Sequence, residues 1–156
     1  MCRFGLMIQS HRIVRKGIVC LAAAVAGIAA AEDQMVVVRR EDAKFVPVDP
    51  ARPNEAQIAV LWGDPTKGPS SMLMRVEKYT GTLHYHTSGY HLVLLEGQVK
   101  HWGERQREAD VPALGPGSYW HQPALQPHGD SCLTDVCLAF IKWEGKWDGF
   151  LATPPK

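Results

Sequence analysis

Short apolar stretches separated by turn residues run through most of the chain, and this pattern constrains the fold more than any other feature. Glycine and proline interrupt the sequence between the stretches, as in Gly63-Asp64-Pro65 and Gly115-Pro116-Gly117. Residues of this kind end strands and form tight turns. From residue 32 onward no segment shows the apolar repeat of a long amphipathic helix. The pattern predicts a single all-β domain, an antiparallel barrel or sandwich, with strands near 35–39, 58–62, 72–76, 91–95, 99–102, 118–121 and 138–143.

The first 31 residues form a segment of different composition. They contain four of the 17 Lys and Arg residues and no Asp or Glu, and residues 17–31 are an uncharged apolar run ending in three alanines. An uncleaved membrane anchor is the alternative, but a spanning helix needs about 20 apolar residues. We therefore expect a secretory signal peptide over 1–31, cleaved near Ala31 and Glu32, and a periplasmic or secreted domain over 32–156.

The charge of the predicted mature domain excludes some partners. Without the leader, 13 basic residues remain against 16 acidic ones, so the domain is mildly acidic. Nucleic-acid binding depends on a clustered basic surface. We expect neither a nucleic-acid partner nor a membrane-bound mature form.

The cysteines are consistent with export. Cys2 and Cys20 fall in the leader, which leaves Cys132 and Cys137 as an even pair in an oxidising compartment. Four residues separate the pair, enough for a tight turn that brings the two Cα atoms within disulfide distance. We expect a disulfide that closes a hairpin; the alternative is two small buried residues on adjacent strands.

Histidines are concentrated in one part of the predicted domain. All six histidines of 32–156 lie between His84 and His128. His84 and His86 are two residues apart, so on a strand their imidazoles point to the same face. Two imidazoles on one face provide two ligands for a divalent transition metal, although such pairs also occur by chance on surface strands.

Two segments resemble the conserved motifs of the cupin superfamily. Residues 81–97 are similar to the first motif, with its His-x-His and an apolar strand that ends in glycine, and residues 116–128 are similar to the second, Pro-x-Gly-x-x-His, with Leu125 where glycine is usual. The resemblance implies a cupin-type double-stranded β-helix, a jelly-roll barrel, over 32–156. It also implies a divalent metal bound by His84, His86 and His128, and a homodimer.

The first motif lacks the carboxylate residue that the family pattern contains. Counting back from Gly97 places Tyr90 where the family has glutamate, and counting forward from His86 places His91 there. Strand alternation favours Tyr90 pointing into the barrel, whereas a bulge would favour His91. The fourth ligand is therefore Tyr90, His91 or water. Tyr90, His91 and His121 are candidates for acid–base catalysis. The alternative for His121 is a partly buried strand residue with no catalytic role. We expect His101 at the surface.

These residues predict a secreted cupin that holds a divalent transition metal (Zn, Fe, Ni or Mn) and binds or acts on a small polar organic molecule. A metal-dependent enzyme of lyase, isomerase or oxygenase type would use the ion as a Lewis acid or to activate oxygen. A non-catalytic binding or sensing module is the alternative, as is a degenerate site in a structural dimer. An enzyme would need an open coordination position and a second polar group beside the metal.

Overall fold

The structure is a computed structural model that describes residues 35–152. Within that range the chain forms strands and two short 3-10 turns, η1 (Arg40–Asp42) and η2 (Glu108–Asp110). No helix among the described residues is long and apolar enough to cross a membrane. The predicted signal peptide, 1–31, lies outside the described residues. The strands are β1 (Val46–Pro47), β2 (Ala56–Gly63), β3 (Ser70–Thr80), β4 (His84–Tyr85), β5 (Tyr90–Glu96), β6 (Val99–Gly103), β7 (Tyr119–Gln122), β8 (His128–Trp143) and β9 (Phe150–Leu151).

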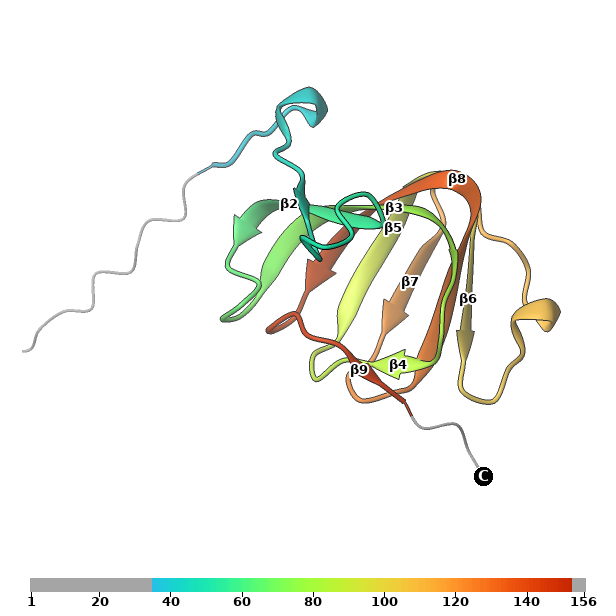
Figure 1. Ribbon diagram of the computed structural model, residues 1–156. Helices are drawn as coiled ribbons and strands as arrows, with labels where there is room; N and C mark the ends of the chain where they lie inside the picture. The colour runs from blue at the N-terminus through green and yellow to red at the C-terminus, as the bar shows by residue number, and fades with distance from the viewer. Residues whose placement is uncertain (1–34, 153–156) are drawn as a thin grey trace, which may run out of the picture. The chain divides into compact units, whose positions relative to one another are not determined.

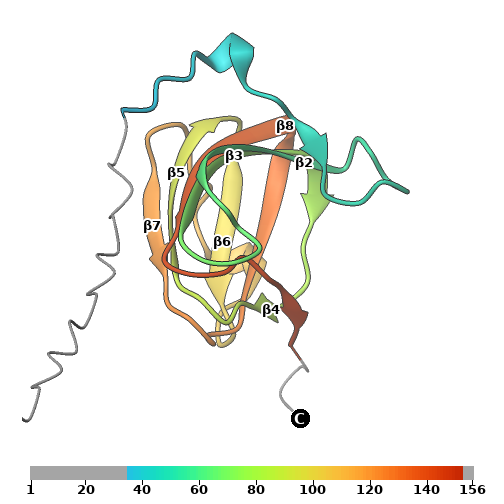
Figure 2. The same ribbon diagram turned by 90° about the vertical axis from the view of Figure 1, so that its left-hand side faces the viewer.

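All strand pairs are antiparallel, and the sheet curls on itself (Figures 1 and 2). The order β1-β2-β3-β8-β4-β9 forms one path, while β5 pairs with β7 and β8, and β6 pairs with β8. β4 and β9 lie side by side at one end of the barrel. The prediction of an all-β antiparallel fold is confirmed.

β8 holds the barrel together because its two halves pair with different strands. Its first part, from His128 to Cys132, pairs with β6, and its last part pairs with β5 from Tyr90 onward. β3 pairs with both parts of β8. Between two paired positions, however, β8 advances four residues, from Cys132 to Val136, while β3 advances only two, from Tyr79 to Glu77. The extra residues form a bulge, which bends the strand and lets it turn the corner of the barrel.

The disulfide joins the two ends of this bulge. Cys132 and Cys137 are paired, with their Cα atoms 5.9 Å apart. The expectation that the bridge would close a hairpin is wrong, because both cysteines belong to β8 and the loop between them is a bulge within one strand. The turn between β5 and β6 packs on the bulge, with Gln98 receiving a hydrogen bond from the Leu133 backbone N–H at 2.8 Å.

The N-terminal part of the domain is less regular than predicted. The stretch 35–39 is exposed and forms no strand, since no partner strand lies beside it. The first pairing is made by β1, which adds to the edge of β2. An edge position tolerates Pro47, which has no backbone N–H to donate.

Two groups of apolar side chains stabilise the barrel. The larger one fills the interior and includes Met72, Leu92, Leu94, Ile141 and Trp143. The smaller one lies on the outside of the β2, β3 and β8 sheet, where Phe45 and its neighbours cover Ala59, Leu73 and Leu138. Both faces of the sheet are thus partly buried, and the interior group forms the walls of the cavity described next.

Candidate metal centre and pocket

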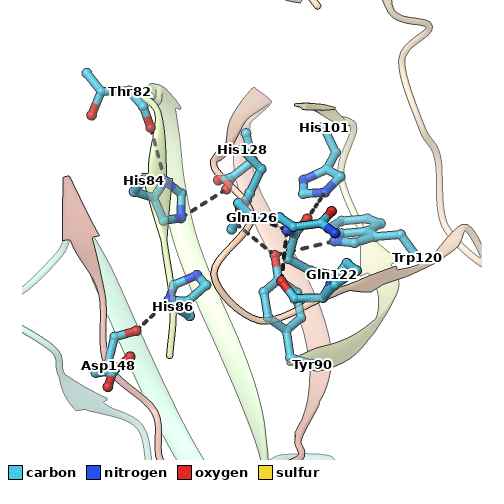
Figure 3. A network of polar contacts seen from close by, with 12 residues as sticks. Thr82, His84, His86, Tyr90, His101, Trp120, Gln122, Gln126, His128 and Asp148 are labelled. Carbon is cyan, nitrogen blue, oxygen red and sulfur yellow. Dashed lines mark hydrogen bonds and ion pairs between the residues drawn. The ribbon is translucent and has the colours of Figure 1, made fainter. Parts of the chain in front are cut away.

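Three histidines meet at one end of the barrel. His84 begins β4, His86 follows that strand, and His128 is the first residue of β8 and the register partner of His84. One ring nitrogen from each lies within 4.8 Å of the other two. Figure 3 shows the three imidazoles facing a common centre. The structure therefore brings together the three residues that the cupin resemblance implied as ligands.

The orientation of each imidazole is set by the backbone. In all three rings Nδ1 lies at hydrogen-bond distance from a main-chain carbonyl, at 3.0 Å for His84 and for His128. A carbonyl only accepts, so Nδ1 carries the proton and the lone pair is left on Nε2. Metal-binding histidines are held by this type of contact in other proteins. The acceptors are Thr82, Asp148 and Gln126 for His84, His86 and His128 respectively.

Burial keeps two of these rings uncharged. His128 is 1% exposed, and burial lowers the pKa of its imidazole to about 3. Burial likewise lowers the pKa of His86. A neutral imidazole is the form that binds a metal. Three neutral, oriented nitrogen donors fit a divalent transition ion such as Zn, Fe or Ni.

Tyr90 points into the barrel, as strand alternation predicts. Its hydroxyl lies 3.3 Å from His128 Nε2 and donates a hydrogen bond to it, while Trp120 Nε1 approaches the same hydroxyl at 3.5 Å. Burial raises the pKa of Tyr90 to about 12. The side chain is therefore a neutral donor beside the three histidines. The bulge that would have brought His91 inward is absent from this part of β5, whose register shift falls later, between Leu94 and Glu96.

His91 and His121 lie on the opposite face of the sheet. They are register partners on β5 and β7, and their rings stack on the outside of the barrel, next to Glu144. Of the candidates for the interior site, His91 and His121 therefore lie outside it, because side chains alternate along a strand and Tyr90 occupies the inner face.

Asp130 is a site residue that the sequence reasoning missed. It follows His128 by two positions on β8 and so points to the same face, where its Oδ2 lies 3.8 Å from His84 Nε2. Burial raises its pKa to about 6. The first motif lacks a carboxylate, and β8, the strand that pairs with β4, supplies one. The His-x-Asp spacing of His128 and Asp130, at the end of the second motif, was the signal that could have revealed it.

His101 also faces inward, contrary to the surface position expected for it. It shares a face with the core residue Val99, two positions earlier on β6, and its ring stacks on Trp120. Its Nε2–H donates to Gln122 Oε1 at 3.1 Å, and burial lowers its pKa to about 4. The amide of Gln122 donates in turn to the Gln126 carbonyl at 3.0 Å, the same oxygen that holds His128.

Leu125 explains why this motif normally contains glycine. Its φ is 61°, in the left-handed region, where a side chain other than glycine is strained. Its backbone N–H donates to the His86 carbonyl at 2.8 Å. The turn thereby connects the second motif to the first and places His128 near His86, with a leucine in an unfavourable conformation.

A pocket of about 780 Å³ opens beside the histidines, within the usual range for small-molecule sites. One end is polar, with His84, His86, Tyr90 and Asp130 on its wall. The rest includes the charged residues Glu55, Glu77 and Lys78 but is mainly apolar and aromatic, with Met74, Leu92, Ile141, Trp120 and Trp143. The pocket suits an organic molecule with a polar end at the histidines and an apolar body.

Solved structures similar to this one include a cupin and two proteins with other names. KdgF from Halomonas sp. is 16% identical with a TM-score of 0.57, over 74% of this chain and 96% of that chain. An RmlC-like cupin from Shewanella frigidimarina is 12% identical with a TM-score of 0.56, over 71% and 91%. The DMSP lyase DddQ from Ruegeria pomeroyi is 16% identical with a TM-score of 0.54, over 78% of this chain but only 62% of the lyase. At these identities the likeness shows the fold and leaves the activity open.

Comparison of sequences identifies the family. A search of curated proteins gave no significant match. A family model described as "Domain of unknown function (DUF4437)" matches residues 21–149, which include all three histidines of the site. The chain therefore belongs to the DUF4437 family, and its β domain has the cupin fold.

Proposed function

We propose that the protein is a metal-dependent enzyme that transfers a proton on a small organic molecule with one polar, oxygen-bearing end. One observation carries this proposal. Three histidines, each with its proton on Nδ1 and its lone pair on Nε2, are gathered beside a carboxylate, Asp130, at the polar end of a largely apolar pocket. The three metal ligands, a proton acceptor and a space for the substrate therefore lie in one place.

Each residue has a role that follows from its position. His84, His86 and His128 hold the ion, a divalent transition metal such as Zn, Fe, Ni or Mn, which when bound supplies Lewis acidity. Tyr90 donates a hydrogen bond at the same end of the pocket. The apolar walls orient the body of the substrate so that its polar end meets the histidines. Asp130 Oδ2, next to His84, accepts a proton from the substrate or returns it.

The geometry favours an enzyme over a closed binding module. Within residues 35–152 the interior group of ligand atoms that all lie within 4.8 Å of one another consists of the three histidines and does not include the Asp130 carboxylate. Catalytic metal sites keep a position open, whereas structural sites fill all four. A proton acceptor beside the site supports lyase or isomerase chemistry in preference to oxygenase chemistry.

Metal analysis and proton exchange together test the proposal. The purified protein should contain or bind one ion at this site, and His84→Ala and His128→Ala should each lose it. A panel of small carboxylic acids, ketones and hydroxy acids is incubated in D2O and followed by proton NMR. We expect deuterium exchange or turnover on at least one compound with the wild type.

Asp130→Asn separates proton transfer from metal binding. This variant should keep the ion but slow the reaction about 100-fold or more, the usual contribution of a positioned acid or base. Retention of the full wild-type metal content in both histidine variants would contradict the ligand assignment. An unchanged rate in Asp130→Asn would contradict the role of the carboxylate.

We also propose that the chain is exported and cleaved near Ala31. The Cys132–Cys137 disulfide supports this, because such bonds persist in oxidising compartments. Protein purified from the periplasm or medium should begin at Glu32 when its N-terminus is sequenced; an intact Met1 in that fraction would contradict the proposal. The homodimer remains a prediction, which light scattering on the purified protein would test.

A further inference from the structure

A second group of metal-binding side chains lies on the outside of the barrel. His91 on β5 and His121 on β7 are register partners, and their ring centres are 4.6 Å apart. Glu144 follows the end of β8, and its backbone N–H donates to the Gly89 carbonyl at 3.0 Å, which fixes it beside the start of β5. Three segments far apart in sequence thus bring two imidazoles and a carboxylate together.

The distances within this group match those of ligands on a single ion. Glu144 Oε1 lies 3.0 Å from His91 Nε2 and 3.6 Å from His121 Nε2, and one ligand atom from each residue lies within 4.8 Å of the others. Donors bound to tetrahedral zinc at about 2.0–2.1 Å lie roughly 3.3 Å from one another. We propose that His91, His121 and Glu144 form a second, exterior site for a divalent transition metal such as Zn²⁺.

Tyr119 supports the ring of His91 for this role. The Tyr119 hydroxyl lies 2.8 Å from His91 Nδ1. When His91 Nε2 binds a metal, the imidazole proton moves to Nδ1 and is donated to the Tyr119 oxygen, so the ring stays neutral. Hydrogen-bond partners of this kind orient metal-binding histidines and raise their basicity.

The site is accessible and has room for water in the coordination shell. The side chains of His91, His121 and Glu144 are 38%, 41% and 49% exposed. Lys142 on β8 is the register partner of His91 and therefore carries its positive charge on the same face. This charge weakens cation binding, so replacement of Lys142 should strengthen it.

The exterior site is independent of the interior one. His91 and its neighbour Tyr90 point to opposite faces of β5, and the two groups of ligands share no residue. Metal at the exterior site would join the edge strand β7 to β5 and to the end of β8, and so stabilise this side of the barrel. The exterior site can therefore exist whether or not the proposed activity is correct.

Metal stoichiometry provides the test. The purified protein is stripped with EDTA and titrated with Zn²⁺ alone by isothermal calorimetry, with bound zinc measured after dialysis. We expect two ions per chain in the wild type, one in a His84→Ala/His128→Ala variant, and one in His121→Asn. Glu144→Gln should weaken the exterior site at least tenfold, and Lys142→Ala should strengthen it.

Several outcomes would overturn the inference. One ion in the wild type and none in the interior variant would show that the exterior group binds no metal. Two ions in His121→Asn, together with unchanged zinc affinity in Glu144→Gln, would place the second ion elsewhere. Zinc-dependent dimers by light scattering that disappear in His121→Asn would show an ion shared between two copies and refute a site within one chain. A rise in melting temperature with Zn²⁺ that persists in the interior variant but disappears when His121→Asn is added would support it.

Discussion

Acidification from pH 7 to pH 5 should weaken the metal-free protein through two buried histidines. Burial lowers the pKa of His101 to about 4 and that of His128 to about 3, from 6.5 in the unfolded chain. Between these values the unfolded state binds a proton at each ring and the folded state does not. The free energy of unfolding therefore decreases as the pH falls below 6.5, and the full contribution is recovered at higher pH.

The magnitude depends on two opposing effects. Each pH unit below 6.5 removes about 1.4 kcal/mol per histidine, so by pH 5 His101 and His128 each remove about 2 kcal/mol. Asp130 acts in the opposite direction, because burial raises its pKa to about 6 and the folded state gains a proton first. Its side chain is 22% exposed, so about 1 kcal/mol is the upper end of its contribution. The loss from the two histidines exceeds the gain from Asp130, so the free energy of unfolding should fall by about 3 kcal/mol in total.

Urea denaturation followed by circular dichroism, at pH 7, 6 and 5 with EDTA, measures this effect. His101→Gln should reduce the loss by about 2 kcal/mol, whereas Asp130→Asn should increase it by about 1 kcal/mol. The two variants change the pH dependence in opposite directions and so serve as controls for each other. A wild-type stability that stays constant or rises toward pH 5 would refute the reasoning, as would equal slopes in the two variants.

Three further changes test the support around the site. Leu125→Gly removes strain at a positive φ and should raise the free energy of unfolding by about 1 kcal/mol, while Leu125→Ala should not, in urea denaturation. Reduction of the Cys132–Cys137 bridge opens a short loop and should cost about 2 kcal/mol, measured in the same way with and without reductant. Gln122→Ala frees the Gln126 carbonyl and should weaken interior zinc binding about tenfold by calorimetry; unchanged affinity would refute its positioning role.

The strand pattern could be predicted from sequence because it is local. The alternation of apolar and polar residues places strands near 72–76 and 138–143, which lie within β3 and β8. β4 and β9 are two residues long each and carry too little pattern to be recognised. The stretch 35–39 has the composition of a strand, but strand formation also requires a partner, which local sequence does not reveal.

The three interior histidines were accessible to sequence reasoning for the same reason. His84 and His86 share a face by their spacing, and the cupin-like motif connects them with His128. The choice between Tyr90 and His91 depended on whether β5 bulges, and the structure places that irregularity beyond Leu94. A single extra residue exchanges the two faces of a strand, so local pattern alone could not decide it.

The sequence by itself determined an antiparallel β domain and the residues most suited to bind a metal, since both follow from periodicity and side-chain chemistry. Only the tertiary structure decided which of the remaining groups come together. Asp130 reaches the interior site, and His91, His121 and Glu144 meet on the outside, because long-range pairing of β5, β7 and β8 fixes their register. The bulge closed by Cys132 and Cys137 sets the path of β8, and with it the position of both groups.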